Sequence, residues 1–227
     1  MRKGWTEIPL NEILERSIGG VWGSEPGTDQ EEVLVVRSTE FTKNGYLNFN
    51  TGVKRSIKTS QLSSRELREG DILLEKSGGG PEQPVGRVVF VESDIPAKSV
   101  CSNFIQLLTP SIDAAVPRFV FLIMWMWHSQ NKTLEYQAQT TGIRNLRTAD
   151  YLEQKVLLPP LAEQIRIVDV VSSVDAYIHA LSTSPSEAIV ATDALYSARR
   201  LRSALLSDLL SGNHEIPASY DSLLGNA

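Results

Sequence analysis

The feature that most restricts the fold of this chain is a helical apolar stripe near its C-terminal end. Beyond Pro159-Pro160, apolar residues recur at spacings of three and four, which is the period of one face of an α-helix. A second pattern of the same period runs from Ile189 to Leu209 and stops before Gly212, a residue suited to a helix C-cap. The first stripe consists of Leu161, Ile165, Val168, Val171, Val174, Ile178 and Leu181.

The segment 182–186 contains Pro185, which kinks the helical region or splits it into two helices. A single straight helix over 161–211 would be about 75 Å long, which is too long to bury its stripe alone. We expect the helices to pair with one another or with a second chain, and the alternative is that both fold back on the preceding domain. The predicted subunit-pairing residues are Leu161, Ile165, Val168, Val171, Ile178 and Leu181.

Upstream of the stripe, the sequence alternates between short apolar runs rich in branched residues and segments rich in Gly, Pro, Ser and Asn, as buried strands and turns do. A helix is expected to open at Pro117 and to run to roughly Gln137. The sequence therefore predicts an α+β fold, with a mixed strand and helix domain over 1–158 and a long, coiled-coil-like helical arm with a C-terminal tail over 159–227. The predicted strands are 33–37, 71–75, 86–92 and 103–108.

Charge is unevenly distributed along the chain. The formal net charge is -5, which argues against a wholly basic nucleic-acid-binding surface. Residues 37–87, however, contain nine Lys and Arg against six Asp and Glu, and form the one net-positive region. Such side chains donate hydrogen bonds to phosphates and base edges, and the alternative is a solvated loop face. This basic sector comprises Arg37, Lys43, Asn44, Lys54, Arg55 and Lys58.

A glycine-rich loop over 76–84 is the sharpest local signal, because its glycines expose backbone amides and permit close approach to a phosphate or base edge. The loop lacks the Gly-Lys-Ser/Thr ending of a nucleoside triphosphate site. Gln83 is suited to reading adenine, and the alternative is a flexible hairpin tip. We expect Ala at Gln83 or Arg87 to weaken specific binding with little loss of folding. The candidate DNA-binding residues here are Lys76, Ser77, Gly78, Gly79, Gln83 and Arg87.

A second polar group, Thr140, Thr141, Arg144 and Asn145, precedes the helical arm. Its hydroxyl, guanidinium and amide groups are suited either to contacting the DNA backbone or to locking the domain onto the arm, and the sequence leaves both roles open.

Catalytic machinery is not apparent in the sequence. A DNA methyltransferase needs Asn/Asp-Pro-Pro-aromatic, whereas the only Pro-Pro here lies between Leu158 and Leu161, and no separated Glu-x-Lys nuclease arrangement follows Asp71. One cysteine and three histidines show no metal-ligand spacing. No apolar run is long enough for a membrane span. We therefore expect a non-catalytic cytoplasmic protein without a metal or cofactor of its own.

Three stretches together resemble the specificity subunits of type I restriction-modification systems. Gly70-Asp71-Ile72-Leu73-Leu74 precedes Val85-Gly86-Arg87-Val88, and the second stretch runs from Gln139 to Leu146 and leads into Leu157-Leu158-Pro159-Pro160-Leu161-Ala162-Glu163-Gln164. The third is Leu205-Leu206-Ser207-Asp208-Leu209-Leu210-Ser211-Gly212, followed by Ile216-Pro217 and Ser219-Tyr220-Asp221.

The resemblance implies a target-recognition domain that reads half of a split site in double-stranded DNA. A family subunit usually carries two such domains held apart by helices, so this chain resembles a half-length form or a gene fragment. Its implied partners are a methyltransferase subunit, which carries S-adenosylmethionine, and a restriction subunit that is a motor and nuclease. Pairing as a homodimer or with another half subunit predicts a palindromic split site. The alternative is a regulatory protein that pairs with a full specificity subunit and alters or blocks its recognition.

Overall fold

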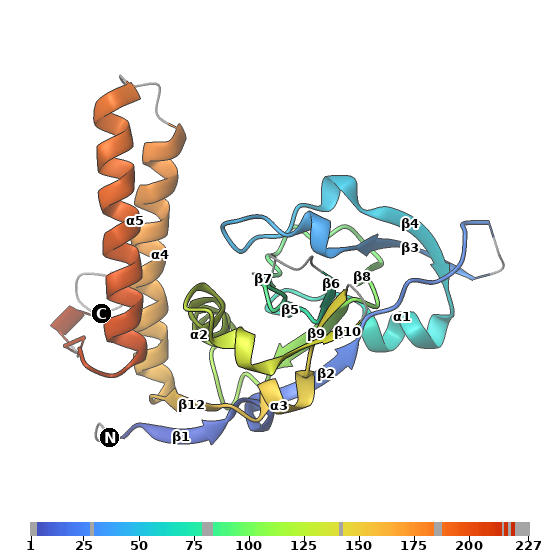
Figure 1. Cartoon of the computed structure of the whole chain (residues 1–227), viewed down its shortest axis with the longest axis horizontal. Helices are drawn as coiled ribbons and strands as arrows, with labels where there is room; N and C mark the ends of the chain where they lie inside the picture. The colour runs from blue at the N-terminus through green and yellow to red at the C-terminus, as the bar shows by residue number, and fades with distance from the viewer. Residues whose placement is uncertain are drawn as a thin grey trace. The chain divides into compact units, whose positions relative to one another are not determined.

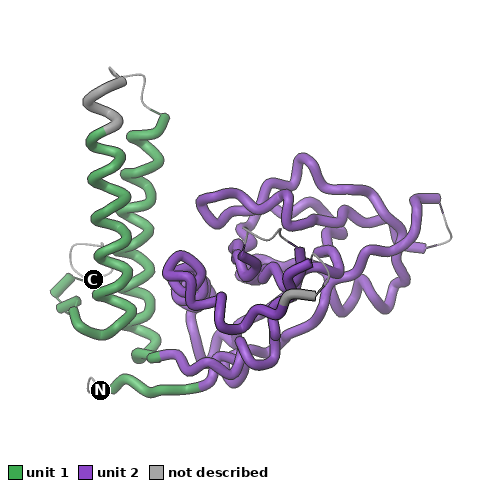
Figure 2. The backbone as a smooth tube through the Cα atoms, in the orientation of Figure 1, with its two compact units in different colours: residues 1–8, 157–227 green, residues 9–156 purple. Residues whose placement is uncertain are grey.

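The computed structural model describes two compact units of the chain, and each is considered by itself (Figure 2). One unit comprises residues 9–156, and the other comprises residues 1–8 together with 157–227. The described residues are 4–27, 30–78, 84–140, 143–183, 188–214, 216–217 and 219–220, with the side chains of 139–140 and 188–192 excepted.

The unit 9–156 is built on β-sheets with short helices around them (Figure 1). An antiparallel four-stranded sheet has the order β2-β9-β5-β7, and its strands are Leu14–Gly19, Ile105–Pro110, Ile72–Glu75 and Val88–Phe90. A three-stranded sheet has the order β4-β3-β8, and its strands are Val53–Ile57, Glu31–Val36 and Ser99–Cys101. A third sheet, β10-β11-β6, comprises Gln137–Thr140, Ile143–Leu146 and Ser77–Gly78. The remaining strands, β1 (Thr6–Pro9) and β12 (Lys155–Leu158), pair with each other.

Helices α1 (Thr59–Arg65), α2 (Pro117–Ser129) and α3 (Thr148–Leu152) accompany these sheets. Short 3-10 helices cover Leu10–Ile13, Ser38–Glu40, Phe49–Thr51 and Lys132–Tyr136. The predicted α+β class is confirmed, and strands overlap all four of the runs from which they were predicted.

Helix α2 begins at Pro117 as expected, but the expectation that it continues to about Gln137 is wrong. The α-helix ends at Ser129 because Asn131 has a positive φ of 59°, in the left-handed region that an α-helix cannot accommodate. Gln137 instead begins strand β10. The apolar run that suggested a long helix stops at Trp127, which is buried and packs edge-on against Tyr151.

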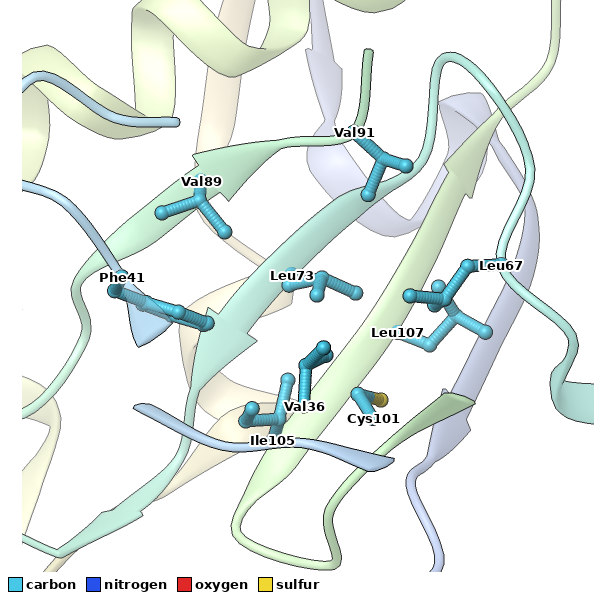
Figure 3. Packing of buried hydrophobic residues seen from close by; sticks show 9 residues of the cluster. All are labelled: Val36, Phe41, Leu67, Leu73, Val89, Val91, Cys101, Ile105 and Leu107. Carbon is cyan, nitrogen blue, oxygen red and sulfur yellow. The ribbon is translucent and has the colours of Figure 1, made fainter. Parts of the chain in front are cut away.

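The core of this unit lies on both faces of the four-stranded sheet. On one face, Leu73 is opposite both Val89 and Leu107, and these side chains pack with residues of β3 and β8 (Figure 3). Neighbouring positions point to the other face, where Phe90 meets Phe121 of α2 with ring centroids 5.7 Å apart. Burial on both faces explains why β5 is a continuous apolar run rather than an alternating one.

A buried ion pair explains why Gly-Asp-Ile-Leu begins this sheet. The fully buried carboxylate of Asp71 accepts two hydrogen bonds from Arg16 Nη2, at 2.9 and 2.8 Å to its two oxygens. It also accepts bonds from the Thr109 hydroxyl and the Arg68 backbone amide. The motif therefore supplies the anion that joins β2, β9 and the start of β5, which is a structural role.

The other unit is a pair of helices, α4 (Leu161–Thr183) and α5 (Ala188–Leu210), that lie side by side (Figure 1). Of the two alternatives expected for this region, a kink or a split, the structure has two separate helices, and Gly212, with φ at +72°, follows the end of the second. Asp175 of α4 forms an ion pair with Arg202 of α5. None of the helices among the described residues has the length and hydropathy that a membrane span requires.

Candidate functional site

The pairing of β6 with β11 brings together two segments that the sequence singled out separately. Arg144 lies opposite Gly78, and Asn145 lies opposite Ser77. The Ser77 hydroxyl donates to the side-chain oxygen of Asn145 at 2.6 Å. The start of the glycine-rich loop and the polar group before the arm therefore form one surface.

Lys76 extends this surface toward the four-stranded sheet. Its Nζ donates to Gln106 Oε1 at 3.4 Å, and Gln106 Nε2 donates to Ser17 Oγ at 3.0 Å. Gly19 makes room for the ammonium group, because a Cβ at that position would lie 2.9 Å from Lys76 Nζ. The chain Lys76–Gln106–Ser17 thus runs across strands β9 and β2.

Arg65, at the C-terminal end of α1, adds a further cation. Its Nε donates to the backbone oxygen of Gly19 at 2.9 Å and its Nη1 donates to Ser64 Oγ at 2.8 Å. Both positive side chains therefore lie next to Gly19. We define the polar cluster as Ser17, Arg65, Lys76, Ser77, Gln106, Arg144 and Asn145.

The chemistry of the polar cluster matches what nucleic acids offer. Three of its members are cations, which donate hydrogen bonds to phosphates, and two carry amides, which read base edges. None of its members is fully buried, and Ser17 is exposed. Sequence reasoning missed Ser17, Arg65 and Gln106, because strand pairing and the position of α1 bring them to this surface and no local motif marks them.

Other residues of the predicted basic sector lie on other elements. Lys43 and Asn44 are exposed in the turn between Thr42 and Tyr46, where Gly45 has a φ of +81°. Lys54 is exposed on β4, and Lys58 is exposed just before α1. Gly79, Gln83 and Thr141 lie outside the described residues, and Thr140 is described only as the last residue of β10.

Two arginines of the predicted sector are engaged within the fold. Arg37 donates to the carboxylate of Glu40, which is buried, at 2.7 and 3.2 Å, and this hydrogen bonding raises the pKa of Arg37. Arg55 is 9% exposed, forms an ion pair with Glu25, and lies 4.8 Å above the ring of Trp22. Both guanidinium groups stabilise local structure, since each neutralises a carboxylate of its own unit.

The structure changes what is expected of Arg87. Its Nε and Nη2 donate to the two oxygens of Glu75 at 2.9 and 2.8 Å, and these hydrogen bonds to the buried carboxylate raise the pKa of Arg87. Nη2 also donates to the backbone oxygen of Ser38. Ala at Arg87 is therefore no longer expected to leave folding nearly unaffected, because it leaves the buried Glu75 carboxylate without its ion-pair partner.

We expect Arg87→Ala to lower the free energy of unfolding by about 3 kcal/mol, since it leaves the Glu75 carboxylate buried without its cation. Urea denaturation followed by circular dichroism measures this change. The double variant Glu75→Gln with Arg87→Ala should recover part of the loss, because the amide is neutral. A loss of under about 1 kcal/mol in the single variant would show that Arg87 contributes little to folding, as the sequence alone suggested.

In the helical unit, the predicted pairing residues are buried, half-buried or exposed. Val171 is buried, as are Ile167 of α4 and Leu206 of α5. Leu161 and Ile165, by contrast, are 39% and 48% exposed. Val168, Ile178 and Leu181 are half-buried. One part of the stripe therefore closes the helix pair within the chain, and its beginning presents apolar surface to solvent.

Comparisons with known proteins agree with this architecture. The model of the type I restriction modification DNA specificity domain matches residues 2–189. The HsdS subunit from Thermoanaerobacter tengcongensis has a similar fold, with a TM-score of 0.52 and 18% identity over 80% of this chain and 44% of that chain. A chain from a solved structure on complex assembly and conformational transition of the type I R-M system also has a similar fold. Its TM-score is 0.54 and its sequence identity is 19%, over 92% of this chain and 46% of that chain.

The chain thus spans less than half the length of the solved structures it matches. No curated protein sequence matches it. The family match covers most of the sequence, and the similar folds extend over both the strand-rich unit and the helices. The chain therefore belongs to the family of type I restriction modification DNA specificity domains.

Proposed function

We propose that this chain is the sequence-reading component of a type I restriction-modification complex and contacts double-stranded DNA through the polar cluster. The observation that carries the proposal is the convergence of Arg65, Lys76 and Arg144 with two amide side chains in a protein whose net charge is -5. Such donors bind phosphates, which position the protein on DNA, and base edges, which specify the sequence. The chain itself performs no catalysis in this proposal, and methyl transfer from S-adenosylmethionine belongs to a methyltransferase subunit.

The helix pair is the proposed site of assembly. Leu161 and Ile165 present apolar surface at the start of α4, and Tyr196 and Leu201 present more of it on α5. We propose that these surfaces bind a second copy of the chain and the methyltransferase subunit, with the motor-nuclease subunit joining for cleavage. Two copies related by a two-fold axis would read a split palindromic site.

Selection of bound duplexes from random DNA tests this function, with the purified chain alone and with a methyltransferase subunit. We expect enrichment of a defined sequence in at least one condition. Enrichment of no sequence in either condition would sink the proposal. Sedimentation of the same samples separates a homodimer from a chain that joins only a full-length specificity subunit as a regulator.

Lys76→Ala and Arg144→Ala should each weaken binding to the selected duplex about tenfold, because each removes a charged donor. Where the lost contact is to a phosphate, the slope of log affinity against log salt should also fall by about one. Fluorescence anisotropy at several salt concentrations measures both effects. Lys132→Ala removes an exposed lysine from a 3-10 helix outside the cluster and serves as the charge-matched control. Equal affinities for all three variants and the unmodified chain would contradict the assignment of the cluster.

A further inference from the structure

The hydrogen bonds inside the polar cluster fix which way its central amide points. The ammonium group of Lys76 can only donate, so the Gln106 atom 3.4 Å from it must be the oxygen. The nitrogen of the same amide then faces Ser17 and donates to its hydroxyl oxygen at 3.0 Å. Lys76 and Gln106 retain further N–H groups, and Ser17 retains its O–H, for a bound ligand.

Asn145 also forms a hydrogen bond within the cluster. Its side-chain oxygen accepts from the Ser77 hydroxyl at 2.6 Å, and its amide nitrogen carries N–H donors. Arg65 and Arg144 carry guanidinium groups, which have donors and no acceptor. The polar cluster is therefore rich in donors, because each of its two amide oxygens already accepts a hydrogen bond within the protein while its ammonium and guanidinium groups only donate.

This one-sided hydrogen-bonding capacity discriminates between bases. In the major groove adenine presents one acceptor and one donor, so an amide reads it by using both its oxygen and its nitrogen. Cytosine presents a donor and needs an acceptor from the protein. Guanine presents two acceptors, O6 and N7, and is the base that a pair of donors matches. Phosphates also accept from donors, but they carry no sequence information.

We propose that Lys76 and Gln106 read a guanine in the major groove, with N–H groups directed to its O6 and N7. The proposal rests on the DNA-recognition function proposed above and adds the identity of a base within the site. Gly19 is the positioning residue in this arrangement. A side chain there would occupy space 2.9 Å from Lys76 Nζ and displace the ammonium group that orients Gln106.

Base analogues in the selected duplex test the proposal. Each guanine is replaced in turn by 7-deazaguanine, which lacks the N7 acceptor, and by inosine, which keeps O6 and N7 but lacks the minor-groove amino group. We expect one guanine at which 7-deazaguanine weakens binding about tenfold while inosine does not. Inosine is thus the matched control for the loss of a guanine as such.

Gln106→Glu tests the residue assignment. The carboxylate keeps the contact with Lys76 but replaces the amide donor by an acceptor, so affinity for the guanine-containing duplex should fall. The penalty for 7-deazaguanine should shrink to under about twofold. Lys76→Met, which shortens the side chain by one atom and removes the donor, is the second variant and should behave alike. Circular dichroism establishes that each variant is folded before its binding is measured.

The outcomes separate the two proposals. If selection enriches a sequence without guanine, if 7-deazaguanine is tolerated at every position, or if both variants keep the full 7-deazaguanine penalty, the guanine assignment is overturned while DNA recognition stands. If selection enriches no sequence, DNA recognition fails and the guanine assignment fails with it. In Gly19→Ala, the penalty for 7-deazaguanine should lie between that of the unmodified chain and that of the Gln106 variant. A penalty equal to that of the unmodified chain would show that Gly19 does not position Lys76.

Discussion

Replacing Arg16 by Met should lower the free energy of unfolding by about 3–5 kcal/mol, because it leaves the fully buried carboxylate of Asp71 without its cation. Arg16 also donates to Thr109 Oγ1 at 2.8 Å and to the backbone oxygen of Glu66 at 3.2 Å. The loss is a large share of the roughly 5–15 kcal/mol by which a domain is usually stable. Urea denaturation followed by circular dichroism measures it.

Arg68→Met is the matched control for this experiment. The Arg68 side chain is exposed, and only its backbone amide donates to Asp71, so the substitution preserves that bond. We expect a change within about 0.5 kcal/mol. Combining Arg16→Met with Asp71→Asn should recover part of the loss, since no net charge is then buried. Equal stability of the Arg16 and Arg68 variants would show that the ion pair does not hold the sheet together.

Replacing Ile165 by Asp should weaken association of the helix pair with its partner by on the order of 100-fold, the size of an interface hot spot. Ile165 is 48% exposed on α4, so the proposed contact loses an apolar side chain and gains a charge that must be desolvated. The helix itself tolerates the change, because the side chain at this position is exposed. Sedimentation velocity with and without the methyltransferase subunit measures the association.

Val171→Asp is the comparison that distinguishes association from folding. Val171 is 1% exposed, so a carboxylate there should unfold the helix pair and lower its helical circular dichroism signal. Ile165→Asp should leave that signal unchanged. If Ile165→Asp retains both self-association and subunit docking, the exposed start of α4 is not the assembly surface.

Several elements could be predicted because their signals are local. Pro117 opens α2 because its fixed φ suits the first turn of a helix, and Gly212 ends α5 because glycine tolerates a positive φ. The end of α2 was misjudged because the left-handed conformation of Asn131 is not imposed by its residue type. Asn adopts that conformation only when its surroundings favour it.

The sequence also could not separate arginines that face a ligand from arginines that form an ion pair with a carboxylate of the same unit. Arg55 and Arg87 have the composition expected of a binding surface, but their guanidinium groups contact Glu25 and Glu75. Ion pairing of this kind depends on which carboxylate the fold brings within reach. For Arg87 that partner is Glu75, which lies twelve residues earlier in the sequence.

The sequence by itself determined the family, the α+β class and the helical period of the C-terminal stripe, because these follow from ordered motifs and from the spacing of apolar residues along the chain. Only the tertiary structure decided which polar side chains share a surface. Ser17, Arg65, Lys76 and Gln106 come from separate segments, and they meet because β2 pairs with β9 and α1 ends beside Gly19. Their shared hydrogen bonds form only once those segments are packed together.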